Sequence, residues 1–155
     1  MQYPIKTALT AGLVAGTLDA ICATVIFSGF FHRGSPIRLW QGVASVLLGR
    51  SASAGGIATA LFGLLMHYCI ATSFAAFFIL LYPRLPFLRQ QKIIAGLLYG
   101  IFVFLIMDVI ILHLLGIAPP KFSLIPSLRS ITVLMLAIGL PISLITSKYY
   151  RKSLM

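Results

Sequence analysis

The chain has 155 residues, of which 60% are hydrophobic and 9% are charged, whereas soluble domains are about 25% charged. Its formal net charge is +10, but the Lys and Arg residues stand at the ends of apolar runs, where flanking bases contact lipid headgroups. This composition excludes a soluble globular domain, and the placement of the bases excludes nucleic acid as a partner.

The first apolar run covers residues 7–31 and carries one charged residue, Asp19, near its middle. A helix needs about 20 apolar residues to cross a bilayer, so this run is long enough to span with some tilt. It is too long for the apolar region of a signal peptide and is predicted to be a retained span. A carboxylate at that depth is costly in hydrocarbon, so Asp19 is expected to face protein, water or a partner.

The connection after this run contains a predicted short helix over residues 36–48. Ser35 and Pro36 are favourable start residues, and Gly49 can end the helix. It is too short to span, and one narrow polar stripe interrupts its apolar surface: Arg38, Gln41 and Ser45. We interpret it as an amphipathic helix lying in the membrane interface or re-entering it, with Trp40 as its anchor. A lid over the other helices is the alternative.

Three further spans are predicted over residues 57–81, 93–115 and 128–146. The turn between the second and third spans holds Pro83 and Pro86, which prevent the helix from continuing. The connection over residues 116–127 is rich in proline and is expected to lie among the headgroups. Pro141, inside the last span, should kink or loosen the helix.

Small residues recur every four positions in the first three spans, and each stripe includes or adjoins an ionisable residue. Stripes of this kind let helix backbones approach closely. Because each ionisable residue shares the side of its helix with small residues, all three are expected to face inward. The stripes are Ala8, Gly12, Gly16 and Ala20, with Ala11, Ala15, Asp19 and Ala23 beside them; Thr59, Gly63, His67, Ala71 and Ala75; and Gly96, Gly100, Phe104 and Asp108.

The distribution of bases predicts the orientation of the four spans. One side holds seven bases in the N-terminal flank, the 82–92 turn and the C-terminal tail, and the other side holds five. The positive-inside rule therefore favours both termini in the cytoplasm.

Asp19, His67 and Asp108 are the primary candidates for an intramembrane site. At a rise of about 1.5 Å per residue, His67 and Asp108 lie within about 6 Å of the depth of Asp19. His113 and His32 are secondary candidates nearer the non-cytoplasmic surface. Such a group can relay protons or hold a small polar solute. The alternative is that the acids are neutral, hydrogen-bonded and only fix helix packing.

Enzymatic and metal functions receive less support from the sequence. No Cys-x-x-Cys or paired His spacing is present, and there is no nucleophile or phosphate-binding motif. We therefore expect no enzyme activity, no cofactor and no metal, although a haem or metal carrier using His67 and His113 stays open.

Several short motifs resemble a group of small bacterial inner-membrane proteins of unknown function: residues 15–19, 41–45, 63–67, 95–100 and 138–141. The third span and the Gly-Ile-Ala-Pro-Pro sequence after it are distantly similar to YagU-like membrane proteins. The resemblance implies four transmembrane helices in a bacterial cytoplasmic membrane and supplies no activity. The last span of that group often carries a histidine before Gly-Leu-Pro, whereas the matching position here, near Leu134, is apolar.

The sequence thus predicts one all-α domain over residues 1–155, an integral membrane four-helix bundle with a short interfacial amphipathic helix between its first two spans. The leading hypothesis is a small permease-like or membrane-homeostasis protein with an Asp/His site for protons or a polar solute. The rival is a structural or partner-binding membrane protein. The expected partner is the phospholipid bilayer, and the sequence leaves both homo-oligomerisation and the identity of a substrate open.

Overall fold

The computed structural model describes residues 3–30, 34–114 and 124–153. Within this part of the chain 94% of the residues are helical and there is no strand, which confirms the all-α prediction. Four helices are long and apolar enough to cross a membrane, as in multi-pass membrane proteins: Pro4–Ser28, Gly56–Leu81, Lys92–Leu114 and Leu124–Arg151.

Three of these four helices contain a π-helical segment. The first consists of α1 (Tyr3–Thr24) and the π segment η1 (Val25–Phe30), whereas the second is the uninterrupted α3 (Gly56–Leu81). The third consists of α5 (Lys92–Phe104), the π segment η3 (Leu105–Ile111) and α6 (Leu112–Leu114). The fourth consists of α7 (Leu124–Val133), the π segment η4 (Leu134–Gly139) and α8 (Leu140–Ser153).

The fourth helix is longer than the predicted span over residues 128–146. It begins at Leu124, inside the connection predicted over residues 116–127, and it continues to Ser153. Pro126 is compatible with this early start because the N–H groups of the first helical turn have no partner within the helix. The loosening expected at Pro141 coincides with η4, the widened turn that ends two residues before this proline.

Shorter helices connect the long ones. A helix over Pro36–Leu48, α2, lies between the first two long helices, and the 3₁₀ segment η2 (Gly49–Ala54) follows it. Gln41 of α2 is only 8% exposed, and its amide nitrogen donates a 2.9 Å hydrogen bond to the carbonyl of Gly56. Helix α4 (Pro86–Gln90) occupies the turn before α5 and starts with a proline, as first helical turns favour.

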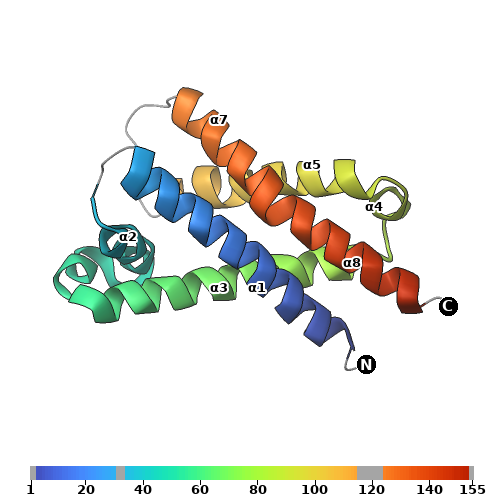
Figure 1. Ribbon diagram of the computed structural model, residues 1–155, viewed down its shortest axis with the longest axis horizontal. Coiled ribbons are helices and arrows are strands. Elements are labelled where there is room, and N and C mark those ends of the chain that lie inside the picture. Colours follow the sequence, from blue (N-terminus) through green and yellow to red (C-terminus); the bar gives the residue numbers. More distant parts are fainter. Residues whose placement is uncertain (1–2, 31–33, 115–123, 154–155) are drawn as a thin grey trace.

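The long helices pack in two closely joined pairs. Helix α1 crosses α3, and α5 lies against η4 and α8, while α1 also contacts η4 and α8 and so joins the pairs. Helix α2 packs on the N-terminal half of α3 (Figure 1). The first helix and the last run in opposite directions, so both ends of the described chain lie toward the same end of the molecule.

The predicted stripes of small residues form these contacts. A Cβ added at Gly12 would lie 2.5 Å from the Thr72 Cα, and one added at Gly16 would lie 3.2 Å from the Ala71 Cβ. In the other pair, an added Cβ at Gly96 would lie 3.0 Å from the carbonyl oxygen of Gly139. Alanine and glycine at these positions therefore allow the helices to touch through their backbones.

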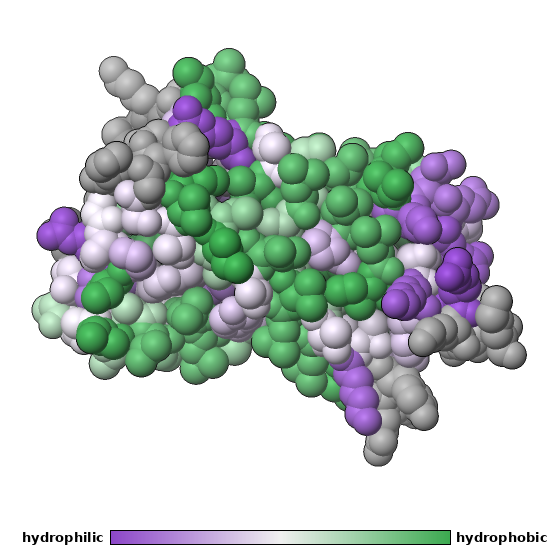
Figure 2. Space-filling view, viewed as in Figure 1, coloured by the Kyte–Doolittle hydropathy of each residue, from purple (hydrophilic) through white to green (hydrophobic). Residues whose placement is uncertain are grey.

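The surface is divided by polarity along the length of the helices. Figure 2 shows hydrophobic residues over the middle of the molecule and hydrophilic residues gathered at the end formed by α4 and the C-terminal part of α8. This end holds five of the bases counted in the sequence: Arg84, Arg89, Lys92, Lys148 and Arg151. The pattern fits helices that cross an apolar layer and end among polar headgroups.

We predict that Gly63→Ala destabilises the α2–α3 contact. The added Cβ would overlap the carbonyl oxygen of Trp40, which is backbone and cannot rotate away. Overpacking of this kind costs about 1–3 kcal/mol. Unfolding in mixed micelles, followed by the fluorescence of the only tryptophan in the chain, measures the loss at the contact itself.

Gly42→Ala is the matched control, because an added Cβ at Gly42 meets no atom within 4 Å. This variant should be unchanged or more stable by up to about 1 kcal/mol, the helix preference of alanine over glycine. Equal free energies of unfolding for Gly63→Ala and Gly42→Ala would contradict the close approach of α2 to α3.

Candidate functional site

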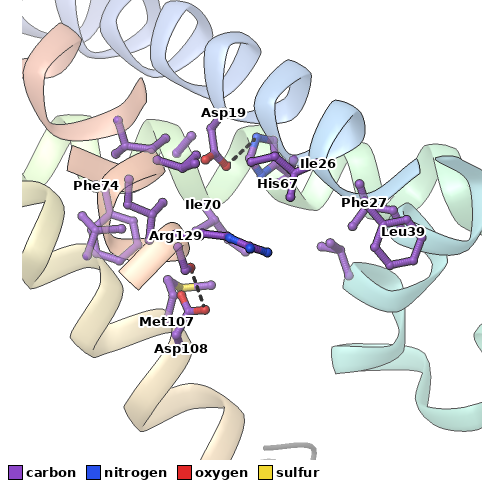
Figure 3. A pocket seen from close by; sticks show the side chains of 18 of the residues that line it. Asp19, Ile26, Phe27, Leu39, His67, Ile70, Phe74, Met107, Asp108 and Arg129 are labelled. Carbon is purple, nitrogen blue, oxygen red and sulfur yellow. Dashed lines mark hydrogen bonds and ion pairs between the residues drawn. The ribbon is translucent and has the colours of Figure 1, made fainter. Parts of the chain in front are cut away.

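A cavity of about 390 Å³ lies between all four long helices and α2. Most of its wall is apolar, but five polar side chains line it: Asp19, His67, Asp108, Arg129 and Ser130. All three primary candidates from the sequence therefore line a single cavity. Figure 3 shows Asp19 and His67 on one side of this cavity and Asp108 on the other.

Asp19 and His67 lie close together across the contact between α1 and α3, and they would form an ion pair when the imidazole is protonated. The distance from His67 Nε2 to Asp19 Oδ2 is 3.9 Å, and each side chain is 15% exposed. The same nitrogen lies 2.9 Å from the carbonyl oxygen of Gly16. Because a carbonyl only accepts, Nε2 carries a proton and donates it to Gly16. Nδ1 is therefore the nitrogen that can exchange a proton.

Aromatic neighbours hold the imidazole of His67 in place. The ring centroid of Trp40, on α2, lies 5.3 Å from that of His67, and the centroid of Tyr68 lies 5.6 Å from that of His67. The hydroxyl of Tyr68 is hydrogen-bonded to Thr17 on α1 at 3.0 Å. Trp40, predicted as an anchor in the membrane interface, thus packs on a site residue.

Asp108 lies on the opposite wall and has a different partner. The hydroxyl of Ser130, on α7, donates a 3.1 Å hydrogen bond to Asp108 Oδ1. Among the described residues no hydrogen bond or ion pair joins Asp108 to Asp19 or His67. The predicted trio is therefore a carboxylate–imidazole pair and a separate acid that face one cavity (Figure 3).

The π-helical segments of the three interrupted spans all contribute to the cavity wall. Leu112 N–H bonds to the carbonyl of Met107 and Leu140 N–H to that of Met135, the five-residue spacing that defines a π turn. Such turns widen a helix and are frequent at functional sites. The lining residues that they supply are Ile26, Phe27, Met107, Asp108, Leu134 and Ile138.

The secondary candidates do not add to this site. His113 is exposed, lies outside the cavity wall, and its Nδ1 is 2.6 Å from the carbonyl of Val109 on its own helix. His32 lies outside the described residues.

Two lining residues were missed at the sequence level. Arg129 is one of the five bases on the side opposite the termini, and neither hydropathy nor spacing indicates that Arg129 or Ser130 lines a site. Their helix begins four residues earlier than predicted, which places both inside the helix rather than at its entrance. Within the described ranges no group of three His, Cys, Asp or Glu side chains could hold a metal ion.

The molecule thus combines four membrane-length helices with a cavity that contains ionisable side chains. Comparisons with models of known protein families, with curated proteins and with solved structures find no match. The chemistry of the cavity therefore has to be inferred from the side chains of this chain.

We predict that Asp19 and His67 are energetically coupled. A double-mutant cycle of Asp19→Asn and His67→Gln should give a coupling free energy of at least about 0.5 kcal/mol, as expected for contacting residues. Unfolding of the four proteins in mixed micelles supplies the measurement. The control cycle pairs His67→Gln with Asp108→Asn and should give a coupling below about 0.5 kcal/mol, because no contact joins these residues. A larger coupling free energy between His67 and Asp108 than between His67 and Asp19 would contradict this arrangement of the three side chains.

Proposed function

We propose that this chain is a small permease-like or membrane-homeostasis protein whose cavity handles protons or a small polar solute. One observation supports this proposal above the others: two carboxylates and an imidazole from three different spans line one cavity. Ionisable groups are expensive within a membrane, and they typically mark proton relays and polar pathways.

The geometry supports separate roles for the two acids. His67 donates from Nε2 to Gly16, so Nδ1 can accept a proton and form an imidazolium that Asp19 stabilises at 3.9 Å. Asp108 has one oxygen bonded to Ser130, which leaves the other oxygen for a proton or a solute. The cavity between them is large enough for several water molecules, which could connect the two walls.

We place the chain in a bacterial inner membrane as a four-helix bundle with cytoplasmic termini. The resemblance to small inner-membrane proteins supports the location, and the hydrophilic end that holds α4 and the C-terminal part of α8 supports the orientation (Figure 2). Helix α2 would lie at the opposite interface and cover the cavity, to which it contributes Leu39 and Val43. We infer no nucleic-acid partner, cofactor or enzymatic activity.

The rival proposal is a structural or partner-binding role in which the polar groups fix helix packing. Two hydrogen bonds favour this rival proposal, because each of them connects two different spans: His67 to the Gly16 carbonyl, and Ser130 to Asp108. Hydrogen bonds between membrane helices contribute about 0.6 kcal/mol on average. Under this proposal, loss of an acid should reduce folding and activity together.

We predict that Asp19→Asn lowers proton flux without preventing folding. Asparagine keeps the size of the side chain but neither exchanges a proton nor stabilises an imidazolium. In proteoliposomes with an internal pH-sensitive dye and a clamped membrane potential, the flux should fall about tenfold, equivalent to about 1.4 kcal/mol in the barrier. Tryptophan fluorescence and the yield of monodisperse protein report folding.

His113→Gln is the control, since this exposed side chain lies outside the cavity, and it should leave the flux unchanged. Equal loss of yield and flux in Asp19→Asn would favour the packing role. Wild-type flux no higher than that of empty liposomes would eliminate proton handling.

A further inference from the structure

A second, larger cavity lies beside the first. It has a volume of about 920 Å³ and runs between α2, α3 and the helix formed by α5 and η3. Phe77 and Phe102 on its wall are 44% and 37% exposed, so this cavity reaches the outer, lipid-facing side of the helices, and we call it the lateral groove. It shares seven lining residues with the central cavity: Phe27, Leu39, Val43, Ile70, Phe74, Met107 and Asp108.

Asp108 is the only acidic residue on the described wall of the lateral groove. The rest of that wall is almost entirely apolar, apart from Arg38 and Ser73. A carboxylate beside apolar surface is costly, and Arg129 lines the central cavity but not the groove, so the inner end of the groove favours a positively charged group. Arg38 is an exposed side chain in the first turn of α2, at the other side of the groove.

The apolar wall suits a bulky aromatic or aliphatic cation. The rings of Phe77 and Phe102 stack with centroids 5.9 Å apart, and the ring of Tyr99 stacks on Phe102 at 5.6 Å. Ring faces attract cations, and desolvation strengthens this attraction. Met66 and Met107 add flexible thioether side chains, which adapt to ligands of different shapes.

We propose that the lateral groove admits hydrophobic cations from the bilayer and holds their charge at Asp108, with their apolar body against Phe77 and Phe102. This inference rests on the proposed function and names the substrate class of the same site. The charge selects a cation over an anion, and the groove selects a ligand that partitions into the membrane. A small hydrated cation would leave the apolar wall uncovered.

The test uses tetraphenylphosphonium and tetraphenylborate, two hydrophobic ions of nearly the same size and opposite charge. The full-length protein is placed in phosphatidylcholine nanodiscs, and each ion is measured by equilibrium dialysis against empty nanodiscs. We expect saturable binding of tetraphenylphosphonium and none of tetraphenylborate. Asp108→Asn keeps an oxygen to accept from Ser130 and should weaken binding about tenfold or more, which corresponds to about 1.4 kcal/mol.

Two further variants keep the test decisive if Asp108→Asn folds poorly. Arg38→Gln removes a positive charge from the groove wall, which would repel a cation, and it should therefore tighten binding of tetraphenylphosphonium. Gly42→Leu projects a side chain into the groove from a position where an added Cβ meets no atom within 4 Å, and it should block binding. Leu47→Ala, on the same helix but outside the groove wall, is the control and should bind as the wild type does.

Equal binding of the two ions, or binding that survives both Asp108→Asn and Gly42→Leu, would overturn the inference. Proton flux without binding of tetraphenylphosphonium would also overturn it while leaving the proposed proton site intact. Selective cation binding that depends on Asp108, in a protein without proton flux, would support the groove and remove only the proton-handling proposal.

Discussion

Direct backbone contact between helices is the constraint on which the rest of the structure depends. At Gly12 and Gly16 the chain has no side chain between α1 and α3, and at Gly96, Gly100 and Gly139 none between α5 and η4. These contacts set the depth and rotation of each span. Asp19 lies within four residues of Gly16, and His67 within four of Gly63, so the close approach brings the carboxylate and the imidazole together. Larger residues at these glycines would separate the pair before any polar interaction could form.

The cavity lies where three of the spans change from α to π geometry. Tight packing along a whole helix pair would leave no room for a solute, since protein interiors are close-packed. Widened turns over Val25–Phe30, Leu105–Ile111 and Leu134–Gly139 line this cavity, and the last of them also makes the close contact with α5 through Gly139. The same chain therefore combines direct backbone contact, which holds the helices together, with widened turns that border the cavity. Only the last of these turns has a proline close after it.

The sequence predicted the helical class, the number of membrane-length helices and the inward direction of the small-residue stripes, because hydropathy and four-residue spacing encode them directly. It also predicted that Asp19 and His67 lie near each other between the helices, because each residue belongs to one of those stripes. It did not predict the π segments, since nothing in Val25–Phe30 or Leu105–Ile111 breaks a helix. It also missed Arg129 and Ser130, because their place in the wall depends on where α7 begins, and helix ends are poorly encoded.

Asp108 belongs to both cavities, and this shared position links the two proposals physically. A single carboxylate has one negative charge, so a bound proton and a bound cation would compete for it. Entry of a hydrophobic cation along the lateral groove would therefore favour release of a proton toward the central cavity, where His67 and water could receive it. Such an exchange keeps the total charge of the site constant, which avoids the large cost of an uncompensated charge in an apolar environment. Packing alone gives no reason for one acid to line both the central cavity and the lateral groove.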